Sequence, residues 1–204
     1  MMRLMITAVM LSISMAGVAQ SGKLKVNKTQ DKFEGTETVT MEGNKVTIDG
    51  AAESAVAKGL LGLLSGNVQI SRIRTEMNLE KHTTPQAQEL SVIVTIEIKD
   101  DAGFYIDNGE SLIFLADSER VALSTQGEFG TERGYKEHKT NARYAITKEQ
   151  LQTLIHAENI SFRILNGGFM ERNEEVRDKD GQYFEGELSE KNVARWREFA
   201  RTYL

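Results

Sequence analysis

The sequence predicts an α+β protein: a mainly antiparallel β-sheet with two amphipathic helices packed on it, plus one apolar helix at residues 51–64. Three observations lead to this class. Short segments with alternating polar and apolar residues recur along the chain, two later segments have helical spacing behind clear N-caps, and no segment repeats at a fixed period. The chain has no Cys, so stability must come from burial without disulfide bonds.

The first nineteen residues predict a cleaved secretory signal peptide. Arg3 supplies the positive charge, an uncharged apolar run continues to about Val18, and Gly17 and Ala19 are the small residues of a cleavage site. The run is short for a membrane span, which needs about 20 apolar residues. We therefore expect cleavage after Ala19, a periplasmic or secreted location, and no transmembrane span in the remainder. A retained single anchor is the alternative.

Charge and length bound the mature chain. The sequence has 25 Lys and Arg residues against 30 Asp and Glu, and its formal net charge of −5 becomes more negative when Arg3 is removed. This acidic balance argues against a general affinity for nucleic acid or anionic lipid. We expect residues 20–204 to form a single domain, with two lobes meeting near 100–110 as the alternative.

The first part of the mature chain predicts short strands and then a helix. Residues 23–26 and 45–48 alternate with period two, and residues 42–44 and 49–50 supply turns. The character changes at residues 51–64, where small and apolar residues fall at helical spacing. This segment is the predicted apolar helix, either buried or covering the open side of the sheet.

Two hairpins are predicted in the middle of the chain. Residues 90–100 form the clearest strand, because β-branched residues alternate along it. A loop at residues 81–89 joins it to an earlier strand that begins near Asn67 and has a bulge near residues 71–72. The second hairpin consists of residues 111–115 and 120–123 around a turn at residues 117–118.

Two shorter strands are predicted around the first amphipathic helix. Residues 126–141 are charged and contain glycine, and we interpret them as a connection to a short strand at 143–146. A further strand at 160–164 follows the helix. Asn166-Gly167-Gly168 is expected to stop that strand.

Both amphipathic helices carry start signals. Thr147 caps the first, Gln150 completes a capping box, and residues 158–159 end the helix. Ser189 caps the second, which runs to Leu204. Most charged residues of the second helix are expected off its buried stripe. The predicted stripes are Leu151, Leu154 and Ile155 in the first helix, and Val193, Trp196, Phe199, Ala200 and Tyr203 in the second.

The second half of the chain contains the successive segments SLIFLADSERVAL, YAITKEQLQTLIHAENISFRI and ELSEKNVARWREF. This succession resembles a module of uncharacterised exported bacterial proteins, in which a hairpin, a Tyr-containing strand, a capped helix, an Arg-bearing strand and a C-terminal helix follow in that order. The resemblance covers roughly residues 111–204 and is one of fold pattern. It implies an α+β fold and an envelope setting, and no functional residue is carried over from it.

The three histidines are the first candidates for catalysis or metal binding. His82, His138 and His156 do not occur in HExxH or in another ligand spacing. His156 is near the end of the first amphipathic helix, where a cation meets a favourable dipole. We therefore expect structural roles, and neither a metal site nor a cofactor is predicted from them.

The segment that precedes the last helix was tested as a calcium loop. With Gly181 as position six, Asp178 and Asp180 take positions three and five and Glu187 takes position twelve. Position one then falls on Val176, which has no side-chain oxygen. We therefore reject the calcium site and interpret the segment as a solvated turn.

No reactive motif was found, so the sequence favours a non-catalytic binding or interaction module that contacts an unknown protein or small ligand. Two alternatives stay open. One is a secreted hydrolase with a carboxylate- or histidine-based site assembled by the fold, because no GxSxG occurs but acidic pairs are abundant. The other is a carrier of a small apolar ligand, with a cavity lined by residues such as Val92, Val94 and Ile113.

Overall fold

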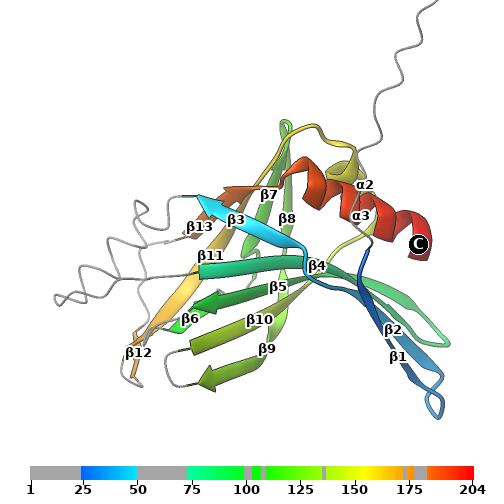
Figure 1. Ribbon diagram of the computed structural model, residues 1–204, viewed down its shortest axis with the longest axis horizontal. Coiled ribbons are helices and arrows are strands. Elements are labelled where there is room, and N and C mark those ends of the chain that lie inside the picture. The colour runs from blue at the N-terminus through cyan, green and yellow to red at the C-terminus, as the bar shows by residue number, and fades with distance from the viewer. Residues whose placement is uncertain are drawn as a thin grey trace, which may run out of the picture.

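The computed structural model describes residues 24–49, 73–98, 103–106, 109–134, 137–171, 174–176 and 183–204. These residues form a thirteen-stranded, strongly curved sheet and two helices that lie against it (Figure 1). The predicted α+β class with an antiparallel sheet and two helices is confirmed. The predicted leader at 1–19 and the apolar helix at 51–64 lie outside the described residues.

The elements follow one another along the chain with all strand pairs antiparallel. The strands are β1 (Val26–Asp31), β2 (Thr36–Met41), β3 (Lys45–Asp49), β4 (Ile73–Thr83), β5 (Gln88–Ile98), β6 (Gly103–Ile106), β7 (Leu112–Ala116), β8 (Glu119–Leu123), β9 (Thr125–Gly134), β10 (Glu137–Ala145), β11 (Ile160–Glu171), β12 (Glu174–Val176) and β13 (Tyr183–Glu187). The helices are α2 (Lys148–His156) and α3 (Glu190–Tyr203).

The sheet order is β8-β7-β11-β13-β3-β4-β5-β10-β9, with β1, β2, β6 and β12 attached to this path. The β3–β13 pair joins the early and late parts of the chain, and its register sets Ile48 opposite Gly186. Gly186 is needed there because a Cβ would lie 2.3 Å from the Thr47 carbonyl oxygen and 2.9 Å from Phe162. The approach of β3, β13 and β11 therefore depends on the missing side chain.

Both predicted central hairpins are present, but the loop of the first is shorter than the predicted 81–89, because β4 continues to Thr83 and β5 begins at Gln88. The predicted start of this hairpin near Asn67 and its bulge near residues 71–72 lie outside the described residues. The β4–β5 pair runs in continuous register from Ile73 opposite Ile98 to Thr83 opposite Gln88. The β7–β8 pair is closed by Asp117, whose φ of +53° places it in the left-handed region. Alternating hydrophobicity is a local signal, which explains why these hairpins could be found without knowledge of their other neighbours.

Residues 126–134 and 137–141 form strands, so the interpretation of this charged segment as a connection is wrong. They belong to β9 and β10, which pair with each other, while β10 also pairs with β5. The inward residues of β10 include Thr140 and Ala142, which are buried but are small or polar. The pairing with β9 also shifts register between Lys139 and Asn141 and again between Ala142 and Tyr144. Both features obscure the alternation of polar and apolar residues by which a strand is recognised in a sequence.

The strand that begins at Ile160 does not stop at Asn166-Gly167-Gly168. β11 continues to Glu171 and exchanges partners on the way: it pairs with β7 and β13 up to Leu165, and with β6 and β12 beyond. The register with β6 shifts between Asn166 and Gly168. Glycines inside a strand can mark such an irregularity as well as its end, which is why the expectation was wrong.

The helices begin where their caps predict. Thr147 Oγ1 accepts from Gln150 N at 3.1 Å, and Gln150 Oε1 accepts from Thr147 N at 2.9 Å, which completes the expected capping box. α3 has a second capping box between Ser189 and Asn192. α2 ends at His156, slightly before the predicted 158–159, because Ala157 already has an extended backbone.

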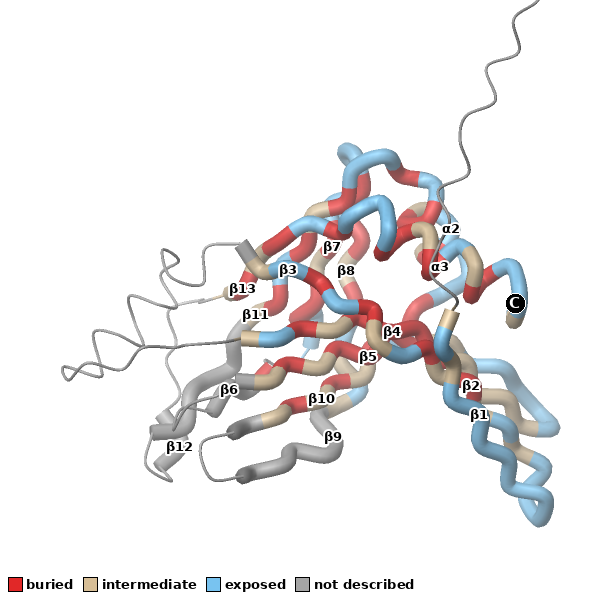
Figure 2. The backbone as a smooth tube through the Cα atoms, viewed as in Figure 1, coloured by how far each residue is buried: buried red, intermediate tan, exposed pale blue. Residues whose placement is uncertain are grey.

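The core lies between the curved sheet and the two helices (Figure 2). Its largest fully buried side chains include Trp196, Tyr144, Phe114, Phe162 and Phe199. The Trp196 and Phe114 rings meet edge to face, with centroids 5.9 Å apart. Trp196 Nε1 donates to the Met77 carbonyl at 3.2 Å, so the indole joins α3 to β4 by a polar contact as well as by packing.

One arginine of α3 departs from the expectation that its charged residues lie off the buried stripe. Arg195 is buried, and its two terminal nitrogens donate to the carbonyls of Glu42 and Gly43 at the corner between β2 and β3. Buried Asn44 in the same corner accepts from Asn192 Nδ2 at 2.9 Å. The corner is not paired as a strand, so α3 supplies the donors that its carbonyl groups need.

Neither α2 nor α3, the helices in the described part of the chain, is long and apolar enough to cross a bilayer.

Candidate functional site

The histidines lie on separate elements. His82 is on β4, with Nδ1 2.9 Å from Thr38 Oγ1. His156 is in the last turn of α2, where Nδ1 donates to the Gln152 carbonyl at 2.8 Å. His138 is in β10, opposite Ile98 of β5. Among the described residues, no group of three or more His, Asp or Glu side chains is arranged to hold a metal ion.

The residues of the rejected calcium loop are only partly described. Asp178 and Asp180 lie outside the described residues. Glu187 is the last residue of β13, where it is exposed and stands opposite Ser161 and Thr47. Val176 is in β12, opposite Phe169 of β11.

The residues suggested for an apolar ligand cavity do not lie together. Val92 and Val94 are completely buried in the core cluster. Ile113 lies on the other side of the sheet, because it alternates with the buried Leu112 and Phe114 along β7. There it contributes to an external groove.

That external groove has a volume of about 520 Å³ and crosses β7, β11 and β13. Leu115 is 47% exposed in it. Arg163 donates to Glu185 at 3.2 Å and lies over the Tyr183 ring, 4.5 Å from its centroid. Exposed ion pairs of this kind contribute little to stability, so the groove is a solvated surface with a small apolar strip.

The second polar surface is the face of β4, β5 and β10 that points away from the core, which we call the outer polar face. Cross-strand register brings its side chains together from distant parts of the chain. The members are Thr40 of β2, Lys45 of β3, Arg74, Glu76, Asn78 and Glu80 of β4, Thr95 and Glu97 of β5, and Lys139, Asn141 and Arg143 of β10.

Hydrogen bonds fix the middle of the outer polar face. Glu80 is buried, and it accepts from Thr40 Oγ1 at 2.8 Å and pairs with Arg143 at 2.9 Å. Thr95 Oγ1 donates to Asn141 Oδ1 at 2.7 Å. These partners come from four strands, so the polar groups of distant segments hold one another in place.

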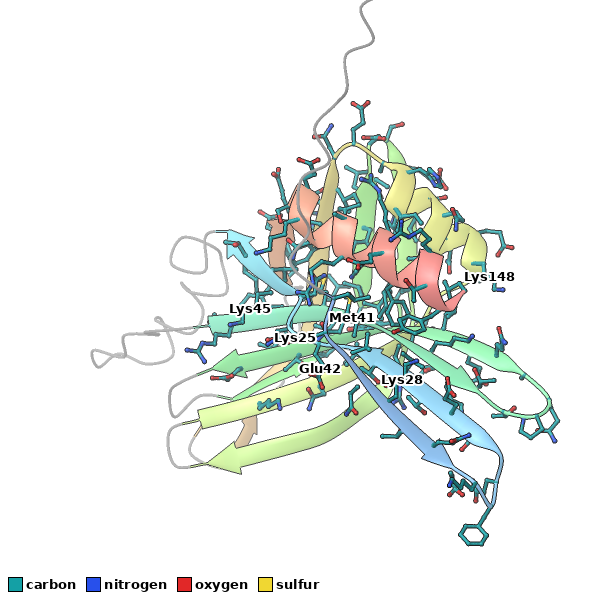
Figure 3. The ribbon with its side chains drawn as sticks, turned by 45° about the vertical axis from the view of Figure 1, so that its right-hand side comes forward. Lys25, Lys28, Met41, Glu42, Lys45 and Lys148 are labelled. Carbon is teal, nitrogen blue, oxygen red and sulfur yellow. The ribbon has the colours of Figure 1, made fainter. Side chains whose placement is uncertain are left out.

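One end of the outer polar face is hollowed. Six residues surround a groove of about 200 Å³, which we call the lysine groove: Lys45, Arg74, Glu76, Thr95, Glu97 and Lys139. The Arg74 and Glu97 side chains approach to 3.5 Å across the β4–β5 pair. Figure 3 labels Lys45 next to Met41 and Glu42, where β2 leads into β3.

The third surface is an arm that consists of β1, β2 and the turn at residues 32–35 between them, projecting from the body of the sheet (Figures 1 and 2). Phe33 at its tip is fully exposed. Asp31 Oδ1 accepts from Phe33 N at 2.8 Å and from Glu34 N at 3.2 Å. These hydrogen bonds fix the turn at whose tip the Phe33 ring is exposed. Gly35 has a φ of +68° and lies close to Pro85 of the β4–β5 turn.

The root of the arm is attached to the end of α3. Lys28 Nζ of β1 lies 4.8 Å from the centroid of the Tyr203 ring. Lys81 of β4, which stands opposite Val39 of β2, donates from Nζ to the Tyr203 carbonyl at 2.8 Å. The arm is therefore anchored at its base and exposed at its tip. Sequence reasoning missed this site, although a lone aromatic residue in the polar segment TQDKFEGT was a readable signal.

Comparison with protein-family models, with curated proteins and with solved structures gave no match.

Proposed function

We propose that this is an exported protein of the bacterial envelope that acts as a non-catalytic binding module and docks a partner protein through the arm. The export part rests on the signal-like leader. The docking part rests on one observation: a fully exposed Phe33 stands at the end of an exposed edge strand.

The edge of β1 supports binding by strand addition. β1 pairs with β2 on one side, and no described strand pairs with its other side. Residues 27–31 are all exposed. An extended segment of a partner would find free main-chain donors and acceptors along this edge, as in other cases where a peptide adds a strand to a sheet. Folded proteins normally protect such edges, and a bound partner strand would cover this one.

Phe33 supplies the anchor beyond the strand. Aromatic side chains that fill a pocket dominate the binding energy of many interfaces. The neighbouring charges, Asp31, Lys32 and Glu34, are mixed and acidic in sum, which disfavours an anionic lipid surface. A single aromatic ring also offers too little apolar area for stable attachment to a membrane. The occupant we propose is therefore a protein with an extended segment beside an apolar pocket.

The experiment is affinity capture from a bacterial envelope extract with the wild-type protein and two variants as baits. Phe33→Ala removes the anchor, and Leu115→Ala removes another exposed apolar side chain from a different surface. We expect the wild type and Leu115→Ala to recover the same partner and Phe33→Ala to lose it. Equal recovery by Phe33→Ala, or no specific partner for the wild type, would reject docking through the arm.

The hydrolase alternative is tested on the same preparations. A non-catalytic protein should show no turnover of ester, peptide or glycoside substrates. Measurable hydrolysis that copurifies with the folded protein would reject the proposal that it acts by binding alone.

A further inference from the structure

The lysine groove carries an inference that is independent of the arm. We infer that it is a binding site for a hydroxylated organic anion of the sugar-acid class. The groove lies on β3, β4, β5 and β10, whereas the proposed partner contact involves β1 and Phe33.

Register places the charges of the groove in two neighbouring rows. In one row Lys45 stands opposite Glu76, which stands opposite Thr95. In the other, Arg74 stands opposite Glu97, which stands opposite Lys139. Opposite residues on one face of an antiparallel sheet have Cβ atoms about 5 Å apart. Three cationic side chains and two carboxylates therefore share one small hollow.

The carboxylates of the groove are already engaged. Glu76 Oε2 accepts from Gly43 N at 3.2 Å and from Asn78 Nδ2 at 3.3 Å. Glu97 is close to Arg74. In the part of the chain that the structure describes, the ammonium groups of Lys45 and Lys139 have neither an ion pair nor a hydrogen bond. The three cations of the groove outnumber its two carboxylates, so the hollow has a net positive charge in a protein whose overall charge is negative.

The donors and acceptors of the groove select the ligand. The ammonium groups of Lys45 and Lys139 border the hollow and can donate to an anionic ligand in it, and charge-assisted hydrogen bonds are the stronger kind. The oxygen atoms of Glu76, Thr95 and Glu97 around them can accept from hydroxyl groups beside the carboxylate of that ligand. A volume of about 200 Å³ is below that of typical drug-sized pockets. It therefore suits one acidic sugar unit, either free or at the end of a longer glycan.

The test is calorimetric titration of the full chain with glucuronate, glucose and acetate at low salt. We expect binding of glucuronate that is about tenfold weaker in Lys45→Gln and in Lys139→Gln, because each loses one charge-assisted bond. Lys148→Gln is the matched control, since Lys148 is an exposed lysine at the start of α2, away from the groove (Figure 3). Binding should also weaken as salt is added, because the groove is open to solvent.

Each contrary outcome overturns a stated part of the inference. If wild-type protein does not bind glucuronate, or if all three lysine variants bind it equally, the groove is not an anion site. If glucose binds as well as glucuronate, the lysines do not select the carboxylate. If acetate binds as well as glucuronate, the groove does not recognise the hydroxyl groups of the ligand. Thermal melting of each variant separates these results from misfolding, and none of them depends on the arm or its partner.

Discussion

The helix-covered side of the sheet and the arm meet at the β2–β4 strand pair but are stabilised in different ways. β4 belongs to the covered sheet and pairs with β2 of the arm. Near Met77 it is covered by α3 and its side chains are buried, whereas at Thr83 it pairs with Glu37, an exposed residue near the outer end of β2. The covered part is held by burial. The outer part of the arm is held by strand pairing, by the turn at Asp31 and by the contact of Lys28 with the Tyr203 ring, while Val39 and Met41 at the inner end of β2 belong to the buried core. This contrast separates the residues that set stability from those available for binding.

The largest expected effect comes from Trp196→Ala. Removing a fully buried aromatic side chain typically costs about 3–5 kcal/mol, whereas an exposed substitution such as Phe33→Ala changes stability by about 0.5 kcal/mol or less. Urea unfolding of the two variants measures both values. A destabilisation by Phe33→Ala close to that of Trp196→Ala would mean that the ring has a structural role, and the contrast would fail.

Arg195→Met tests whether the hydrogen bonds between α3 and the corner between β2 and β3 contribute to the stability of the helix-covered side. The substitution keeps much of the side-chain volume but leaves the carbonyls of Glu42 and Gly43 without these donors. We expect a loss of about 1.5–3 kcal/mol in the free energy of unfolding, the range for hydrogen bonds with one charged partner. Arg201→Met, at an exposed position of the same helix, is the control. Equal effects of the two substitutions would contradict a specific role of Arg195.

Thr147→Ala should have a smaller effect on the same side. It removes the cap of α2, which typically costs about 1 kcal/mol, while Thr147→Ser keeps the hydroxyl and should retain most of the stability. Chemical denaturation of both variants checks this. If Thr147→Ala and Thr147→Ser have the same free energy of unfolding, the cap does not contribute to the stability of the helix-covered side, and the contrast with the arm is weakened.

The smallest expected effect concerns Glu149 in the first turn of α2. A hydrogen bond from its backbone amide, with a further one from Thr147 and the charge of Lys148, lowers the pKa of the Glu149 carboxyl. Because the folded pKa lies below the unfolded one, the stabilisation is present above the unfolded pKa and is lost as the pH falls through the folded pKa. Glu149→Gln should therefore melt slightly below the wild type at neutral pH and together with it in acid. A difference that grows in acid would contradict the sign.

The sequence predicts best what neighbouring residues encode. The capping box of α2, the Ser189 cap of α3, the helical stripes and the two hairpins follow from spacing within short segments. The extent of β9, β10 and β11 could not be predicted in this way, because polar or small residues such as Thr140 and Gly168 become strand residues only through their partners.

The candidate sites were less predictable than the fold. The lysine groove assembles side chains from positions 45, 74, 95 and 139, and cross-strand register is what brings them together. The sequence around Arg195 is that of an exposed helical arginine. Its burial depends on the β2–β3 corner, which is distant in sequence and packs against it. Phe33 was visible as a lone aromatic residue, but its full exposure depends on how the arm projects.

The most direct test of the division between covered side and arm is hydrogen exchange of the wild-type protein alone and with the partner recovered from the envelope extract. We predict that amides along the outer edge of β1 exchange rapidly in the free protein and slowly in the complex, while the amides of β5 near Val92 and Val94 are protected in both states. Unchanged exchange along β1 in the complex, with new protection confined to other elements, would contradict the role assigned to the arm.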